Sequence, residues 1–381
     1  MQFNSADRYP PVMNQAALLA ERLDVVLLDT GPHDPAPPAV PGLRRSRVTW
    51  APSSRPWRFS RLSARAVFAV RARRLAATVS AAVVAYEPDA IACMLTGAQG
   101  RHKLTVAHLH EHPSPGVYDS TTDRIALGYV RRRIGAADVL VVADARRGQL
   151  LRERWGLAAA PLVVRNCPRR LDSVPEPRLA GVLSEHGLGA GQVVYYQGSI
   201  GAHAGLEDLV STMPSWPLRS LFVLAGRVTR EFRGTLETCA AAVGVAGRLC
   251  FLGQIPYREL FGLAAGANVG VSLLNPASEQ WRLAAGASNK RFEYAALGLP
   301  QVTTAAPGIE ETFVSRGMAL AVPWGDRAAL AAAINRLLRD PELRRRMGER
   351  ARATHLSEYN YEGEFAPVLE MICRGAEEGS H

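Results

Sequence analysis

The segment YYQGSIG, residues Tyr195 to Gly201, carries an apolar run into a turn that contains two glycines. Gly205 follows, and residues 206–213 have a helical pattern. A strand that passes through such a turn into a helix points backbone N–H groups at an anion, commonly a phosphate. A loop whose glycines only satisfy turn geometry has the same signature, so this segment alone leaves both interpretations open.

Short apolar segments alternate with stretches of helical period along both halves of the chain. The first half contains Val25 to Leu28, Ala90 to Leu95, Leu104 to Leu109, Val139 to Val142 and Leu162 to Val164. The second half contains Val193 to Tyr196, Leu221 to Leu224, Leu249 to Leu252, Val269 to Leu273, Gln301 to Thr303 and Ala319 to Val322. This alternation predicts an α/β fold, with helices covering a parallel sheet, in each half.

The length of 381 residues exceeds what one hydrophobic core ordinarily supports. We expect four parts: an N-terminal Rossmann-like domain at 1–170, a proline-bearing linker at 171–190, a C-terminal Rossmann-like domain at 191–355, and a helix and tail at 356–381 that packs back on the N-terminal domain. The opening residues Met1 to Phe3 supply only a short first strand.

The composition, with 48% hydrophobic and 21% charged residues, is typical of a globular protein. The five cysteines are scattered without a C-x-x-C pair, so we expect no disulfide framework, no metal and no cofactor. No apolar run reaches the roughly 18 residues that a membrane span requires, and no export signal opens the chain. We therefore expect a soluble, cytoplasmic protein.

The formal net charge of +10 raises nucleic acid, an anionic membrane surface and a phosphorylated substrate as partners. Arg58, Arg61 and Arg65 fall on one helical face, and further arginines follow up to Arg74. A basic amphipathic stretch of this kind is typical of peripheral contact with the inner face of a membrane, and equally of a solvated helix. Because no recognised nucleic-acid-binding module appears, we expect no nucleic acid partner.

A second motif, SNKRFEYAALGLP, occupies Ser288 to Pro300 and predicts a helix closed by Gly298. Lys290 and Glu293 lie three residues apart on one face of this helix. Lys290, one of only two lysines in the chain, can reach a phosphate, and Glu293 can bind sugar hydroxyls. The alternative is an ordinary surface ion pair between these two side chains.

Three histidines, His108, His110 and His112, stand at the end of a predicted strand, where α/β folds place ligand contacts. His108 and His110 point to the same face because side chains alternate along a strand. The H-x-H spacing suits a metal, but no carboxylate or cysteine cluster accompanies it, so structural histidines are favoured for two of the three.

The second half resembles the C-terminal domain of retaining GT-B glycosyltransferases of the large group 1 type, with an NKxFEY-type donor motif. The matching segments follow in order: YYQGSIGAHAGLEDLV, LFVLAGR, LCFLGQIPYRELFGLAAGANVGVSLL, SNKRFEYAALGLPQVTT and GIEETF, covering about 190–340. The first half resembles the acceptor domain of the group through AADVLVVAD and VVRNCP. The resemblance implies the GT-B fold, two Rossmann-like domains facing each other across a cleft that binds the donor.

The resemblance also implies the site residues. It places the donor nucleotide on Gly198, Ser199, Arg227, Gln254, Ile255, Asn289, Lys290 and Glu293. It implies that His110 contacts the donor sugar and that Lys290 serves catalysis at the diphosphate. Family members commonly have an arginine at the position of Ser199, a lysine at that of Ala204 and a glutamate at that of Ala285.

The implied activity is transfer of a sugar from a nucleoside diphosphate sugar, of UDP or GDP type, to an acceptor hydroxyl with retention of anomeric configuration. The acceptor is a small molecule or a lipid-linked glycan. No protein nucleophile is needed, because the leaving diphosphate itself helps to deprotonate the acceptor. Two alternatives stay open: a sugar-nucleotide 2-epimerase, and a donor-binding homologue with weakened catalysis.

Overall fold

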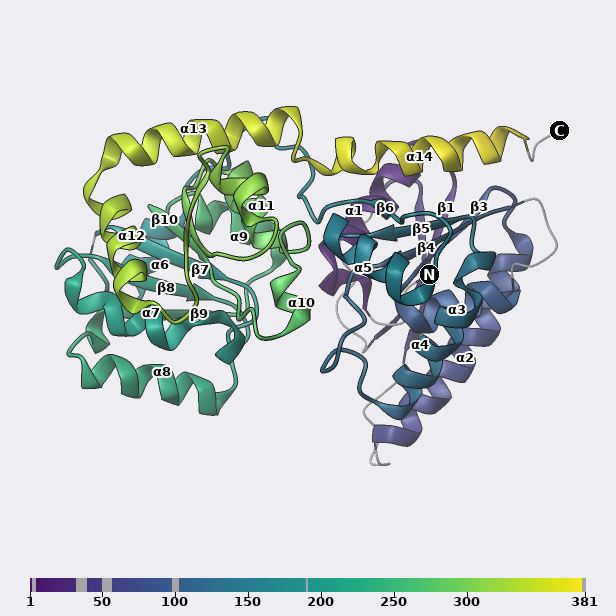
Figure 1. The fold of residues 1–381 in the computed structure, drawn as a ribbon, viewed down its shortest axis with the longest axis horizontal. Helices are drawn as coiled ribbons and strands as arrows, with labels where there is room; N and C mark the ends of the chain where they lie inside the picture. The colour runs from purple at the N-terminus through teal and green to yellow at the C-terminus, as the bar shows by residue number, and fades with distance from the viewer. Residues whose placement is uncertain (2–4, 32–39, 50–56, 98–102, 190, 379–381) are drawn as a thin grey trace. The chain divides into compact units, whose positions relative to one another are not determined.

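The computed structural model describes residues 1, 5–31, 40–49, 57–97, 103–189 and 191–378, and the chain divides into two compact units (Figure 1). Unit 1 comprises Met1–Arg169 and Tyr361–His381, and unit 2 comprises Arg170–Asn360. The final helix is therefore part of unit 1. The stretch 171–190, which we expected as a linker, belongs to unit 2 and contains a helix with buried residues.

Unit 2 is built on a six-stranded, all-parallel sheet with the order β12-β11-β10-β7-β8-β9. Its strands are β7 (Val193–Gln197), β8 (Leu221–Ala225), β9 (Leu249–Gly253), β10 (Val269–Ser272), β11 (Gln301–Thr304) and β12 (Ala319–Val322). The chain proceeds from β7 to β8 on one side and places β10 on the other. Ligands of open α/β sheets bind outside the carboxyl ends of the strands at such a switch point.

Helices cover both faces of this sheet, because alternate strand residues point to opposite sides. Val194 and Tyr196 face the core beneath α7, α8 and α12, whereas Val193 and Tyr195 face the core beneath α6, α9 and α11. The α-helices of unit 2 are α6 (Leu179–Glu185), α7 (Leu206–Thr212), α8 (Arg230–Ala242), α9 (Tyr257–Ala264), α10 (Glu279–Arg282), α11 (Asn289–Ala296), α12 (Arg327–Arg339) and α13 (Pro341–Ser357). Short turns complete the unit: η3 (Ala202–Ala204), η4 (Met213–Ser215), η5 (Ala246–Arg248) and the π-helical η6 (Glu310–Val314).

Unit 1 contains a four-stranded parallel sheet of order β3-β4-β5-β6 and a parallel pair β1-β2. Its strands are β1 (Val25–Gly31), β2 (Leu43–Thr49), β3 (Ala82–Tyr86), β4 (Leu104–Leu109), β5 (Val139–Val142) and β6 (Leu162–Val163). Its helices are η1 (Ala6–Arg8), α1 (Pro10–Ala20), α2 (Trp57–Thr78), α3 (Glu87–Gly97), α4 (Thr121–Arg133), η2 (Ile134–Ala136), α5 (Ala145–Trp155) and α14 (Tyr361–Glu378). The expected α/β architecture is confirmed in both units.

One expected strand is wrong: Ala90 to Leu95 lies inside helix α3. A short apolar run is compatible with a buried strand or a buried helix, and periodicity alone does not distinguish them. The neighbouring sequence carries the missed signal, because Pro88 and the acidic Glu87 and Asp89 are typical of a first helical turn. The strand of this region is β3, which ends at Tyr86, directly before α3. The short first strand expected at Met1 to Phe3 falls largely on residues 2–4, outside the described residues.

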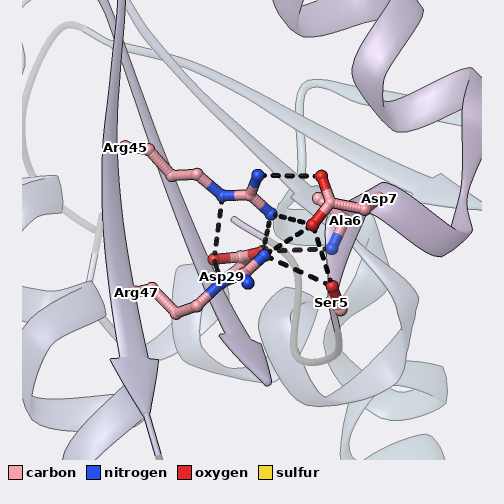
Figure 2. Close-up of polar contacts among 6 residues, drawn as sticks. All are labelled: Ser5, Ala6, Asp7, Asp29, Arg45 and Arg47. Atoms are coloured by element: carbon pink, nitrogen blue, oxygen red, sulfur yellow. Dashed lines mark hydrogen bonds and ion pairs between the residues drawn. The ribbon is translucent and has the colours of Figure 1, made fainter. Parts of the chain in front are cut away.

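A buried ion-pair cluster joins β1 and β2 to the N-terminal turn η1 (Figure 2). Asp29 of β1 is fully buried and accepts hydrogen bonds from Arg45 and Arg47 of β2 and from the backbone N–H of Ala6 at 3.1 Å. Asp7 accepts from the same two arginines, at 2.8 and 2.7 Å. Two carboxylates thus face two guanidinium groups, which balances the charge of the cluster.

The last helix, α14, is fixed to unit 1 by a buried polar contact. Gln15 of α1 donates to the Tyr361 hydroxyl at 2.7 Å and accepts from the Tyr86 hydroxyl at 2.7 Å. Its amide nitrogen also lies 2.8 Å from Nδ1 of His108. One side chain therefore ties α1, β3, β4 and α14 together. Within the described ranges, no helix has the length and apolar character needed to cross a bilayer.

Candidate functional site

Three turn glycines mark the carboxyl ends of adjacent strands in unit 2: Gly198 after β7, Gly226 after β8 and Gly253 at the end of β9. The N–H of Gly198 donates to Ala225 at 3.0 Å, and the N–H of Gly226 donates to Gly253 at 2.7 Å. A β-carbon at Gly226 would lie 1.8 Å from the carbonyl oxygen of Gly198. The close approach of these two loops therefore requires glycine at position 226.

Lys290 of α11 lies directly against the Gly198 turn. A β-carbon at Gly198 would come within 3.3 Å of the Lys290 nitrogen, and the backbone φ of +117° there favours glycine. The ammonium donates to the Tyr196 hydroxyl at 3.1 Å and lies 4.4 Å from the centre of that ring, while the hydroxyl donates to the Ser199 carbonyl at 2.6 Å. The lysine is thus held over the loop by an aromatic platform.

The charge of Lys290 is tuned by its surroundings. Burial, and then the nearby Arg291, lower the pKa of its ammonium to about 8, and Glu293 opposes this change. The group is mostly protonated at neutral pH but is poorly solvated, so an anion arriving beside it would gain a strong, little-screened attraction.

Glu293, one turn further along α11, is 4% exposed. The Gln197 amide nitrogen donates to its carboxylate, and Tyr257 of α9 is a second hydrogen-bond partner. Burial raises the pKa of Glu293, while the bonds from Gln197 and Tyr257 and the charge of Lys290 lower it. The side-chain amide oxygen of Gln197 is buried and has no hydrogen-bond partner among the described residues. The region therefore contains acceptor oxygens suited to hydroxyl donors.

Lys290 and Glu293 do not form the surface ion pair that we considered as the alternative. Each is engaged by a different residue of β7, Tyr196 for the lysine and Gln197 for the glutamate. Their neighbour Arg291 is 1% exposed and bonds to Ser272, Thr303 and the Ala284 carbonyl. Arg291 is consequently a structural residue that closes the core between β10 and β11.

The other expected donor contacts lie at the same end of the sheet. Ser199 follows Gly198 and is exposed, and Arg227 follows Gly226 with an exposed side chain. Gln254 and Ile255 follow β9; the first is exposed and the second packs against the apolar core beneath α9. Asn289 is the first residue of α11 and is half-buried.

His203, which the sequence offered as a substitute for the cations missing at Ser199 and Ala204, also belongs to this neighbourhood, as does Trp281, which was not among our expected site residues. Their rings stack with centroids 5.0 Å apart and planes inclined by 19°. The sequence carries no signal for this contact, because 78 positions separate them and only the β7–β10 adjacency brings their loops together. Ala204 and Ala285 are buried, so methyl groups occupy two positions at which the family resemblance implies charged residues.

The histidine expected at the donor sugar, His110, is in unit 1 and is 4% exposed. Its ring lies 4.0 Å from that of His108 and stacks on Tyr86 at 5.6 Å. Burial, and then Arg147, lower its pKa to about 3, against a hydrogen bond with Asn166. His110 is therefore neutral and enclosed, and a role in donor binding, which stays a prediction, requires its loop to open.

Glu87 holds the backbone of the same loop. It is the first residue of α3, directly after β3, with a left-handed φ of 65°, and its carboxylate accepts from the N–H of His110 at 2.8 Å and from the Tyr118 hydroxyl. Burial, and then Glu111, raise its pKa to about 7. A strained backbone and a perturbed carboxyl at the carboxyl end of parallel strands are features that gather at functional sites.

The fold defined by these two units is GT-B. Solved structures that share it include sucrose-phosphate synthase from Thermosynechococcus elongatus, with a TM-score of 0.72, 21% identity and coverage of 95% of this chain and 92% of that one. The Anabaena protein HepE, solved in complex with UDP, has a TM-score of 0.71, 16% identity and 98% coverage of both chains. WaaG, a glycosyltransferase involved in lipopolysaccharide biosynthesis, has a TM-score of 0.67, 14% identity and 97% and 96% coverage.

Sequence comparison points to the same class. Residues 218–370 match the family model described as glycosyl transferase-like. The alpha-D-kanosaminyltransferase of Streptomyces kanamyceticus is 25% identical over 260 residues, which span 66% of this chain and 64% of that protein. Residues 218–370 are thus similar to a glycosyl transferase-like family, and the chain shares its fold with the structures above.

Proposed function

We propose that this chain transfers a sugar from a nucleoside diphosphate sugar to an acceptor hydroxyl, with retention of anomeric configuration. The observation that carries the proposal is the joint placement of Lys290 against the Gly198 turn and of buried Glu293 one helical turn away. A compact cation beside exposed backbone suits a diphosphate, and a buried carboxylate suits hydroxyl groups. Retention rests on the family resemblance.

In the proposed reaction the site acts through position and charge. Lys290 stabilises the negative charge that develops on the leaving diphosphate, and Glu293 fixes the nucleoside through its ribose hydroxyls. UDP is the first donor nucleotide to test, because HepE was solved with UDP and with UDP-glucose, and a trehalose-6-phosphate structure from E. coli is bound with UDP-2-fluoro glucose.

The test uses purified full-length chain and a panel of UDP and GDP sugars. Thermal unfolding identifies the donor, because a ligand at a hundredfold excess over its Kd stabilises the folded state by ~3 kcal/mol. Mass spectrometry with a panel of aminosugar and lipid-linked acceptors then detects transfer, and NMR of the product reports its anomeric configuration. If no nucleotide sugar shifts the unfolding temperature, the proposal is wrong.

A donor-binding homologue with weak turnover is the second candidate, favoured by the alanines at 204 and 285. Hydrolysis of the donor without acceptor separates it from the first, because a binding protein leaves the nucleotide sugar intact. The epimerase alternative predicts a changed sugar on an intact nucleotide, which the same mass and NMR measurements detect.

We also propose peripheral contact of helix α2 with anionic membrane, which would bring a lipid-linked acceptor to the protein. Val67 and Val70 are 44% and 50% exposed beside the exposed Arg71 and Arg74. Arg65 is excluded from this surface, because it pairs with aspartates of α3 and α4. The side chains of Arg58 and Arg61 lie outside the described residues.

Sedimentation with phosphatidylcholine vesicles, with and without phosphatidylglycerol, tests this contact. The double variant Arg71→Glu/Arg74→Glu should lose binding to the anionic vesicles. The exposed arginines of unit 2 provide a control with the same change of charge, Arg230→Glu/Arg336→Glu, which should bind as the parent does. If both double variants lost binding to the anionic vesicles equally, the net charge of the protein would explain the binding, and the proposed contact through α2 would be wrong.

A further inference from the structure

His203 is fixed in the loop that connects β7 to α7. Its ring stacks on Trp281 of α10, and its carbonyl oxygen accepts from the N–H of Asn275 at 2.9 Å. Both partners belong to the segment that follows β10. The imidazole is therefore held between the two strands that flank the switch point of the sheet, where ligands of this architecture bind.

The ring nitrogens of His203 are uncommitted. Across the described part of the chain, no residue forms a hydrogen bond with either of them. A β-carbon at Gly201 would lie 3.2 Å from Nδ1, so the ring has its present place because residue 201 has no side chain. The imidazole is half-buried and retains its hydrogen-bonding capacity for a ligand.

Lys290 is the charged residue that lowers the pKa of the His203 imidazole. Burial, and then Lys290, lower the pKa of His203 to about 4, so the imidazole is neutral at pH 7 in the absence of ligand. The other charged groups on neighbouring elements compensate one another: Glu279 pairs with Arg282 on α10 at 3.7 Å, and Asp208 of α7 pairs with Arg327 at 2.7 Å. Glu207 of α7 is half-buried and adds one negative charge nearby.

We propose that His203 is a second contact for the donor diphosphate, which takes up a proton from solvent as the donor binds and then acts as a cation beside Lys290. This inference rests on the proposed function. In the free protein, burial and the positive charge of Lys290 both disfavour protonation of the imidazole. A bound diphosphate dianion neutralises the repulsion from Lys290 and attracts the protonated ring. In the balanced step, the neutral imidazole of His203, the donor dianion and one proton from solvent give a complex with a protonated imidazole, and no other covalent bond changes.

Calorimetry tests the proton directly. UDP-glucose and GDP-mannose are titrated into the full chain at pH 6.0 in two buffers that differ in ionisation enthalpy. A nucleoside diphosphate sugar is the right probe, because both phosphates are diesters and do not titrate in this range, unlike the terminal phosphate of free UDP. Lys290, with a pKa of about 8, is already protonated at this pH and cannot be the source of uptake.

The parent should take up close to one proton per donor, and its affinity should rise about tenfold as the pH falls from ~7.5 to ~5.5, since the complex holds more protons than the free protein. His203→Asn should take up none and lose that pH dependence. His203→Lys, with a permanent cation, should bind at pH 7.5 at least as tightly as the parent. The control is His186→Asn, which changes an exposed histidine of the same unit and should behave as the parent.

The outcomes are distinct. Donor binding without proton uptake in the parent, or with undiminished uptake in His203→Asn, overturns the role of His203 and leaves the proposed function standing. Binding of no nucleotide sugar of the panel by the parent contradicts the proposed function, and the inference falls with it. Unfolding temperatures of the free variants within a few degrees of the parent show that the comparison concerns binding and not folding.

Discussion

The ammonium of Lys290 and the α-carbon of Gly198 are in such close contact that a β-carbon at position 198 would lie 3.2 Å from Cε and 3.3 Å from Nζ of the lysine. The glycine is therefore part of the cation's environment as well as of the turn. Three predictions concern this contact and the groups around it, and a fourth concerns the ion-pair cluster of unit 1.

Gly198→Ala should weaken donor binding more than tenfold, because the new methyl group displaces Lys290 and the backbone φ of +117° disfavours alanine. Gly244→Ala is the matched control: it also has positive φ, but open space surrounds the site of its β-carbon. Calorimetric titration with a nucleotide sugar measures both variants. If Gly198→Ala binds the donor as tightly as Gly244→Ala, the contact between Gly198 and Lys290 does not contribute to donor binding.

Lys290→Ala should lower turnover by ~10²-fold or more, and Lys290→Arg should recover only part of it, because a planar guanidinium does not reproduce a compact point charge on a flexible stem beside the diphosphate. With a pKa of about 8, loss of the lysine proton should decrease kcat/KM as the pH rises above ~8, and Lys290→Arg should lack this decline. The control is Lys103→Ala in unit 1, which replaces the other lysine. Full activity of Lys290→Arg at pH 7 would contradict the prediction.

Glu293→Ala should weaken nucleotide binding about tenfold to a hundredfold, because a charge-assisted bond to a hydroxyl is worth roughly 1.5–3 kcal/mol. The same substitution should abolish discrimination between UDP and its 2′-deoxy and 3′-deoxy analogues, measured as a ratio of Kd values. Glu259→Ala, an exposed glutamate on the nearby α9, is the control. Retained discrimination in Glu293→Ala would show that another group binds the ribose.

Asp7→Asn should destabilise unit 1 at pH 7. Burial raises the pKa of Asp7, but its bonds to Arg45 and Arg47 outweigh that effect and set it at about 2, below the ordinary value of 3.8. The stabilisation is thus complete above pH ~4 and is lost as the pH falls toward 2. Urea unfolding at pH 7, 5 and 3 measures the difference in stability from the parent, which should be the same at pH 7 and 5 and smaller at pH 3. Asp24→Asn, at an exposed position, should show no such trend.

The strands of unit 2 and the two motifs could be predicted from sequence, because their signals are local: an apolar run, a turn glycine and a helix cap. The engagement of Lys290 by Tyr196 and of Glu293 by Gln197 could not, since it depends on α11 packing beside β7, almost a hundred residues away. The burial of the His110 side chain could not be predicted from the sequence for a similar reason. Its neighbours Tyr86 and Arg147 come from other strands and helices, and no spacing in the sequence reveals them.

Unit 1 is built from two separate stretches of the chain, which the hydrogen bond between Gln15 and Tyr361 joins, and this has a consequence for biosynthesis. A ribosome completes all of unit 2 before the last helix of unit 1 emerges. Until then the nascent N-terminal unit carries an uncovered surface where α14 will pack, with the Gln15 amide short of a partner. Folding of the first residues to be made thus waits for the last, and a ribosome that stalls after Asn360 would release a chain with a finished second unit and an unfinished first.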